Sequence, residues 1–125
     1  PGCNPPKQEE EFQVAKTDLS TEQVPRGFPE GVPIEQGAKI VQSYEAEAND
    51  GRHQATRVFE SANSVAQNYQ VYDNFFDKNG WTILNQSKSD NLAFFQASKN
   101  AIQLFVAISK NSVTGTVSVN LSSVF

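Results

Sequence analysis

Hydrophobic and polar residues alternate along most of the chain after residue 37, in short runs separated by turn-forming residues. The clearest run covers residues 113–124, where valines and a leucine alternate with threonine, serine and asparagine. This pattern predicts a strand with one buried and one solvated face. Similar runs, separated by Asn-Asp-Gly and by serine- and lysine-containing turns, predict five more strands: residues 38–48, 52–60, 81–86, 92–97 and 101–109.

One segment follows a helical period instead. Large apolar side chains recur at spacings of four, three and four residues, which places them on one side of a helix: Val65, Tyr69, Tyr72 and Phe76. Residues 61–64 can cap its start, and Asn79-Gly80 ends it. The order strand, strand, helix and four strands predicts an α+β fold, in which one helix packs on one face of an antiparallel sheet of about six strands.

The first 33 residues differ from the rest of the chain. They contain all six prolines, and only six residues among Val, Ile, Leu, Phe, Tyr and Trp, against 29 in residues 34–125. Only the second part can bury a core. Residues 12–24 have a weak helical pattern without caps, and the apolar-proline pairs after them favour an extended path along the domain surface. We expect residues 1–31 to form a flexible tether and residues 32–125 a single α+β domain.

The predicted sheet is wider than the predicted helix. Six strands span about 25 Å, whereas one helix covers about 10–12 Å. Three arrangements can account for this difference. The sheet curls around the helix, or the proline-rich segment and a partner cover the remainder of the sheet, or the far face is polar. Large aromatic groups on two of the strands point both ways, and we expect Phe94, Phe95 and Phe105 to include a surface for a protein partner.

The net charge of −4 lies mainly in the first segment. Residues 1–33 carry six acids and three bases, which leaves −3, and the remaining residues carry −1. A nearly neutral domain has no positive electrostatic potential that would attract the phosphate groups of a nucleic acid, so we expect no nucleic-acid partner.

Residues with catalytic or ligating chemistry are few. His53 is the single histidine and Cys3 the single cysteine, and they lie far apart in the sequence, so no metal set and no nucleophile-base pair can be assembled from them. Four acids gather around the first hairpin, and they are expected to be solvated rather than catalytic: Glu45, Glu47, Asp50 and Glu60. We expect no metal, no cofactor and no enzymatic activity.

Two sets of residues resemble a known class of proteins. Gly2-Cys3, followed by proline, glutamate and glutamine, resembles the mature end of a bacterial lipoprotein. The entry Val32-Pro33 to Gly37-Ala38-Lys39 and the helix end Asn79-Gly80-Trp81 are similar to those of small exported bacterial lipoprotein domains of unassigned function. The resemblance implies a lipid on Cys3, a membrane as partner, and a place in the cell envelope on the extracytoplasmic side.

The sequence leaves three functions open. The first is a non-enzymatic lipoprotein domain that acts as a binding or assembly module. The second is a secreted inhibitor or small-ligand-binding protein in which Cys3 has no role. A small hydrolase is the third.

Overall fold

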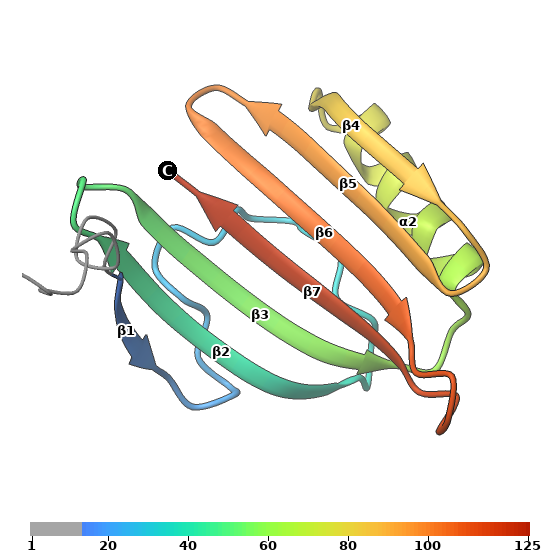
Figure 1. Cartoon of the computed structure of the whole chain (residues 1–125). Coiled ribbons are helices and arrows are strands. Elements are labelled where there is room, and N and C mark those ends of the chain that lie inside the picture. The colour runs from blue at the N-terminus through green and yellow to red at the C-terminus, as the bar shows by residue number, and fades with distance from the viewer. Residues whose placement is uncertain (1–13) are drawn as a thin grey trace, which may run out of the picture.

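The computed structural model describes residues 14–125. Along this part of the chain the elements are β1 (Val14–Asp18), β2 (Lys39–Ala48), β3 (His53–Ser61), α2 (Val65–Lys78), β4 (Thr82–Lys88), β5 (Leu92–Lys99), β6 (Ile102–Lys110) and β7 (Val117–Val124). The strands form one antiparallel sheet in the order β1-β2-β3-β7-β6-β5-β4 (Figure 1). The predicted α+β class and antiparallel sheet are confirmed. The described residues contain seven strands, and the predicted number of about six was wrong because it left out β1.

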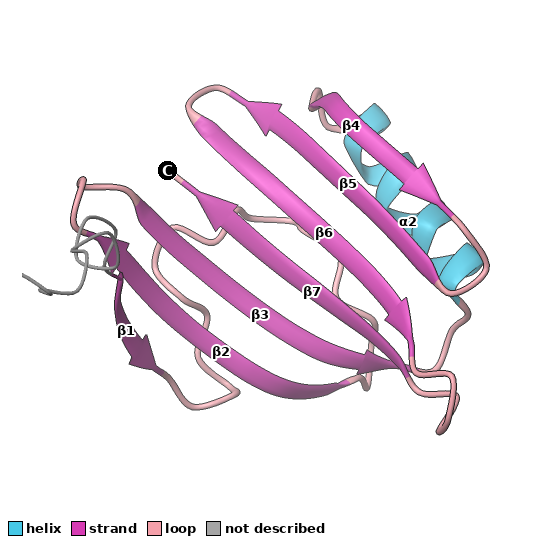
Figure 2. Ribbon diagram, in the orientation of Figure 1, coloured by secondary structure: helices cyan, strands magenta, loops and turns pink. Residues whose placement is uncertain are grey.

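Strict alternation gives the central strands two different faces. On β5, β6 and β7 every second side chain is buried, including Phe95, Val106 and Val119, each 0% exposed. These side chains belong to one core with Tyr72 and Phe76 of α2. They therefore point to the face of the sheet on which α2 lies (Figure 2), which we call the inner face. The opposite face, which we call the open face, carries the half-buried and exposed members of the same strands.

Helix α2 forms where the sequence predicts it and covers only part of the inner face. Ser64 and Gln67 form a capping box at its start, and the Asn79 N–H donates to the carbonyl of Phe75 at its end. Tyr72 and Phe76 are at most 1% exposed. The helix packs on β4, β5 and β6, so β2, β3 and part of β7 need another cover.

The proline-rich segment, residues 19–38, supplies that cover. Its backbone accepts hydrogen bonds from inward side chains of the sheet: Arg57 Nη2 donates to the carbonyl of Thr21 at 2.9 Å, and Ser43 Oγ to the carbonyl of Gln23 at 2.7 Å. Pro25 in the same segment is buried. In Figures 1 and 2 the segment lies behind the sheet, as α2 does.

Part of the expected tether is therefore folded. Residues 14–18 pair with β2 in an antiparallel ladder, with Val14 opposite Ala48 and Asp18 opposite Tyr44. Residues 19–31 pack on the inner face, so the assignment of the whole range 1–31 to a flexible tether is corrected for residues 14–31. Its first part, residues 1–13, lies outside the described residues.

Candidate functional site

The largest hollow described here opens at the N-terminal end of α2, and we call it the α2 pocket. It has a volume of about 650 Å³. Its walls come from three parts of the chain that meet at one end of the sheet: the β3–α2 connection, the β4–β5 turn and the β6–β7 turn. Its lining residues are Ser61, Ala62, Asn63, Ser64, Val65, Ala66, Gln67, Lys88, Ser89, Asp90, Lys110, Gly115 and Val117.

A carboxylate from the proline-rich segment holds one wall of the α2 pocket. Glu35 accepts hydrogen bonds from the Ser61 hydroxyl, from the Ala62 N–H at 2.9 Å and from Asn63 Nδ2 at 3.1 Å. The Ser61 hydroxyl first, and the Ala62 N–H after it, hold the pKa of the Glu35 carboxyl below its ordinary value of 4.5. The β3–α2 connection is thereby fixed to a segment distant in the sequence.

Buried Asn68 fixes the same connection from the helix. Its Nδ2 donates to Ser61 Oγ and to the carbonyl of Ser64, both at 2.9 Å. Buried amides are costly unless they are hydrogen-bonded, and these bonds satisfy the amide while they anchor the first turn of α2. The wall of the α2 pocket is therefore built in advance of any ligand.

Charge and apolar surface are separated in the α2 pocket. Val65 and Val117, which are 3% and 5% exposed, belong to the core and form its apolar part. Lys88 and Lys110 bring positive charge to the lining, and Asp90 is the one acid among the lining residues. The first turn of α2 itself contains no acidic residue, and the negative charge near this end of the helix is that of Glu35, which is engaged by Ser61, Ala62 and Asn63. The arrangement suits a molecule with an apolar part and a negative group.

The space between α2 and the sheet is filled by aromatic rings. Tyr69 stacks on Phe95 with ring centroids 4.5 Å apart, and Phe76 meets Phe95 at 5.3 Å in an edge-on arrangement. Trp81 lies 5.8 Å from Phe76. Close-packed rings leave little room for a further molecule. A ligand of this structure therefore has to bind at the margin of the core, where the α2 pocket lies.

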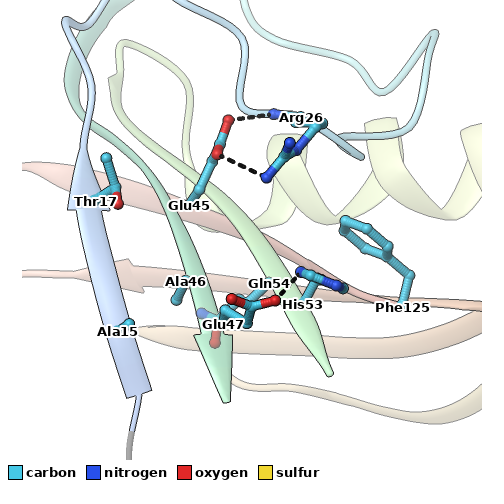
Figure 3. Close-up of a pocket in the computed structure, with 9 residues that line it drawn as sticks. All are labelled: Ala15, Thr17, Arg26, Glu45, Ala46, Glu47, His53, Gln54 and Phe125. Atoms are coloured by element: carbon cyan, nitrogen blue, oxygen red, sulfur yellow. Dashed lines mark hydrogen bonds and ion pairs between the residues drawn. The ribbon is translucent and has the colours of Figure 1, made fainter. Parts of the chain in front are cut away.

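A smaller pocket of about 120 Å³ lies beside β1, β2 and the end of the chain (Figure 3). The Glu45 carboxylate accepts from the Arg26 N–H at 2.8 Å and lies 3.7 Å from the Arg26 guanidinium. His53 Nδ1 is 3.5 Å from a Glu47 carboxylate oxygen, and its ring stacks on Phe125 with centroids 5.4 Å apart. These side chains largely satisfy one another, so the pocket is a set of structural contacts.

The four acids of the first hairpin do not form one cluster. Glu45 and Glu47 lie in the small pocket, whereas Asp50 pairs with Arg52 through an Nε–Oδ2 contact of 2.8 Å and Glu60 lies at the other end of the sheet. Within residues 14–125 no group of three or more His, Cys, Asp and Glu side chains could hold a metal ion.

The three phenylalanines proposed as a partner surface separate. Phe94 and Phe105 are half-buried on the open face, on neighbouring strands. Phe95 is 0% exposed and packs under α2, because neighbouring residues of a strand point to opposite faces. Phe95 therefore belongs to the core, and its inclusion in the surface is corrected. The predicted lipid site, Cys3, lies outside the described residues.

Sequence reasoning missed the α2 pocket. Lys88 and Lys110 belong to two of the predicted turns, Glu35 belongs to no predicted element, and the three are far apart in the sequence. Their proximity depends on the strand order, which brings the β4–β5 and β6–β7 turns to the same end of the sheet. The serine and lysine residues in those turns were the one local signal.

No helix in the described part of the chain is long and apolar enough to cross a membrane. No curated protein and no solved structure is significantly similar to the chain. A family model described as START domain-like matches residues 41–120, from within β2 to within β7, which is 80 of the 125 residues. This match agrees with a ligand-binding module, the coarser form of the binding function expected from the sequence. The chain belongs to the START domain-like family.

Proposed function

We propose that this protein is a ligand-binding module whose α2 pocket takes a small amphipathic molecule with a negatively charged group. The observation that carries the proposal is the pairing of two lysines, Lys88 and Lys110, with an apolar floor of Val65 and Val117 in a hollow of about 650 Å³. Pockets for small ligands usually measure about 300–1,000 Å³ and combine apolar lining with few polar groups.

The two lysine side chains favour an anion. Neither ammonium group forms an ion pair with a described residue, and that of Lys88 lies 5.0 Å from the centre of the Tyr69 ring. A carboxylate between them would gain charge-assisted hydrogen bonds. An alkyl part of the same molecule would lie on Val65 and Val117, where burial of apolar surface stabilises the complex.

The proposal is one of binding rather than catalysis. The three serine hydroxyls of the α2 pocket already serve the fold: Ser61 donates to Glu35, Ser64 accepts from the Gln67 N–H, and Ser89 donates to the carbonyl of Leu92. Activation of a hydroxyl nucleophile needs a neighbouring base that takes its proton. Ser61 has a carboxylate partner in Glu35, but the lowered pKa of Glu35 makes it a weak base, and Ser61 Oγ also accepts hydrogen bonds from the Asn63 N–H and Asn68 Nδ2. Hydroxyls engaged in caps and turns are poorly placed for that role.

Calorimetric titration with decanoate and with decanol tests the proposal. We expect decanoate to bind more tightly than decanol, and Lys88→Gln and Lys110→Gln each to weaken decanoate binding by about tenfold, the loss of one charge-assisted contact. Lys78→Gln is the matched control, because Lys78 lies in the last turn of α2, at the opposite end from the α2 pocket. Equal affinity for the two compounds, or no effect of either lysine substitution, would contradict the proposal.

We further infer that the module is held at a membrane by lipid on Cys3 and faces the extracytoplasmic side of the cell envelope. Support comes from Gly2-Cys3 and the polar, proline-containing segment after it. Two or more acyl chains hold a protein at a membrane almost permanently, because each buried methylene contributes about 0.8 kcal/mol. Mass spectrometry of the protein extracted from its source membrane tests this. An unmodified Cys3 would favour the secreted small-ligand-binding alternative.

A further inference from the structure

The open face is free of charge on β5, β6 and β7, and charge returns on this face at Glu60 of the neighbouring β3, which is opposite Ser118 of β7. The outward side chains of β5, β6 and β7 are serine, asparagine, glutamine, alanine, leucine, valine and phenylalanine, without one acid or base. Both α2 and residues 19–38 lie on the other side of the sheet, and no described element crosses the front in the view of Figure 2. Solvated sheet faces usually carry charged residues, which keep a protein soluble, so a wide neutral face needs an explanation.

Amide side chains form a ladder across this face. Asn85 Nδ2 on β4 donates to Gln96 Oε1 on β5 at 2.9 Å, and Gln96 Nε2 donates to Gln103 Oε1 on β6 at 3.1 Å. Each amide offers two donor hydrogens and two acceptor lone pairs, so the ladder uses only part of their capacity. The remaining donors and acceptors are held in fixed directions, which lowers the entropic cost of binding a partner.

Two phenylalanine rings lie beside the amide ladder. Phe105 on β6 is opposite Gln96 on β5 and Ser122 on β7. In the neighbouring row Phe94 on β5 is opposite Ala107 on β6, which is in turn opposite Asn120 on β7. Phe94 and Phe105 are thus diagonal neighbours, within reach of each other on one face. Both are half-buried, so each presents part of its ring to solvent beside hydroxyl and amide groups.

We propose that the open face binds a neutral glycan chain. A sugar ring has C–H groups on its faces and hydroxyls around its rim; the C–H groups suit the negative face of an aromatic ring, and the hydroxyls suit amides that both donate and accept. Successive sugars would lie on Phe94 and Phe105 while their hydroxyls meet Gln96, Gln103 and Asn120. The glycan would lie flat on the open face, on the opposite side of the sheet from α2.

Other partners fit the open face less well. A nucleic acid or an acidic polysaccharide needs cations, and β5, β6 and β7 offer none here. A lipid surface needs continuous apolar area, which the amide ladder interrupts. A second copy of the chain, or another protein with an apolar patch, would bury amides such as Gln96 without replacing their bonds to water, which is costly.

The test is calorimetric titration of the full chain with cellohexaose, mannohexaose and chitohexaose, with hexagalacturonate as the anionic comparison. We expect at least one neutral hexasaccharide to bind and hexagalacturonate to bind more weakly. Phe105→Ala and Gln96→Ala should each reduce the affinity by about tenfold, the loss of one stacking or hydrogen-bonding contact. Gln70→Ala is the matched control, because Gln70 is an exposed glutamine of α2 that donates to Asn74 at 3.1 Å.

If Phe105→Ala disturbs the fold, Gln96→Ala still tests the proposal. Gln96 takes part in the amide ladder through its side chain alone, so this substitution leaves the backbone pairing of β5 in place. The proposal is overturned if the wild-type chain binds none of the three neutral hexasaccharides, or if both variants bind like the wild type. It is also overturned if sedimentation shows a dimer that Phe105→Ala dissociates, which would assign the open face to a second copy. Decanoate binding in the α2 pocket is measured separately, so failure of one proposal leaves the other testable.

Discussion

The hydroxyl group of Tyr72 on α2 donates a 2.6 Å hydrogen bond to the carbonyl oxygen of Pro33 in the proline-rich segment. Tyr72 is 1% exposed, and its burial, followed by the nearby negative charge of Glu35, raises the pKa of its hydroxyl far above the ordinary value. The group therefore stays protonated and remains a donor. This bond joins the two elements that together cover the inner face of the sheet.

Tyr72→Phe tests this bond. The substitution leaves the Pro33 carbonyl without its donor, and a buried acceptor left unsatisfied costs about 1–3 kcal/mol. Tyr69→Phe is the matched control on the same helix, because the Tyr69 hydroxyl makes no hydrogen bond with a described residue; it should change the free energy of unfolding by less than about 0.5 kcal/mol. Urea unfolding of the two variants measures the difference, and equal stabilities would show that the Tyr72 bond contributes nothing.

Glu35 predicts a dependence of stability on pH. Its hydrogen bonds to Ser61, Ala62 and Asn63 lower the pKa of its carboxyl in the folded state. A group whose pKa is lower folded than unfolded stabilises the fold above its unfolded pKa, near 4.5, and that contribution disappears as the pH falls through the folded pKa. The free energy of unfolding of the wild type should therefore fall below pH about 4.5 more steeply than that of Glu35→Gln.

Glu22→Gln provides the control for the Glu35 experiment. Glu22 is an exposed acid of the same segment that makes no hydrogen bond or ion pair with a described residue. Its replacement should leave the acid limb of the stability curve unchanged. If Glu22→Gln flattens that limb as much as Glu35→Gln does, the general loss of negative charge, and not the Glu35 contacts, explains the pH dependence.

Gly27 is required by both its backbone and its neighbour. Its φ of +85° lies in the left-handed region, and a Cβ atom there would stand 2.0 Å from the ring of Phe125. Gly37 has a φ of +78° with nothing within 4 Å of a Cβ, so Gly37→Ala should cost only the backbone strain, about 1–2 kcal/mol. Gly27→Ala should cost more, because the Phe125 ring must also move away from His53. Equal losses in thermal unfolding would contradict a role for the Phe125 contact.

Elements with their own periodic pattern could be predicted from the sequence. The alternation of Val117, Val119 and Leu121 predicts β7, and the spacing of Tyr69, Tyr72 and Phe76 predicts α2. These patterns work because burial of every second residue, or of one helical stripe, is decided by local geometry. The same geometry explains why one of three phenylalanines was assigned to the wrong side.

Elements defined by distant partners could not be predicted. Strand β1 has the sequence Val-Ala-Lys-Thr-Asp, which lacks an apolar alternation, and it is a strand because its backbone pairs with β2. The α2 pocket likewise depends on turns brought together by the order of the strands. A single sequence contains no local signal for either relationship, since both are set by tertiary contacts.

The last prediction concerns residues 14–31, for which the sequence and the structure lead to different expectations. A chain that begins at Val14 keeps β1 and the inner-face cover, whereas a chain that begins at Val32 loses the partners of Arg57 and Ser43. Arg57 Nε is already buried without a hydrogen-bond partner. The hydrogen bond to the Thr21 carbonyl is therefore needed to offset the cost of burying the guanidinium group. Each polar group that loses its partner costs about 1–3 kcal/mol where it stays buried, against a total stability of about 5–15 kcal/mol for a typical domain.

We expect the chain from Val14 to unfold cooperatively like the full chain, and the chain from Val32 to unfold at a clearly lower temperature or without a cooperative transition. If both truncated chains unfold at the same temperature, residues 14–31 are dispensable, and the domain boundary near Val32 predicted from the apolar content of the sequence is the correct one.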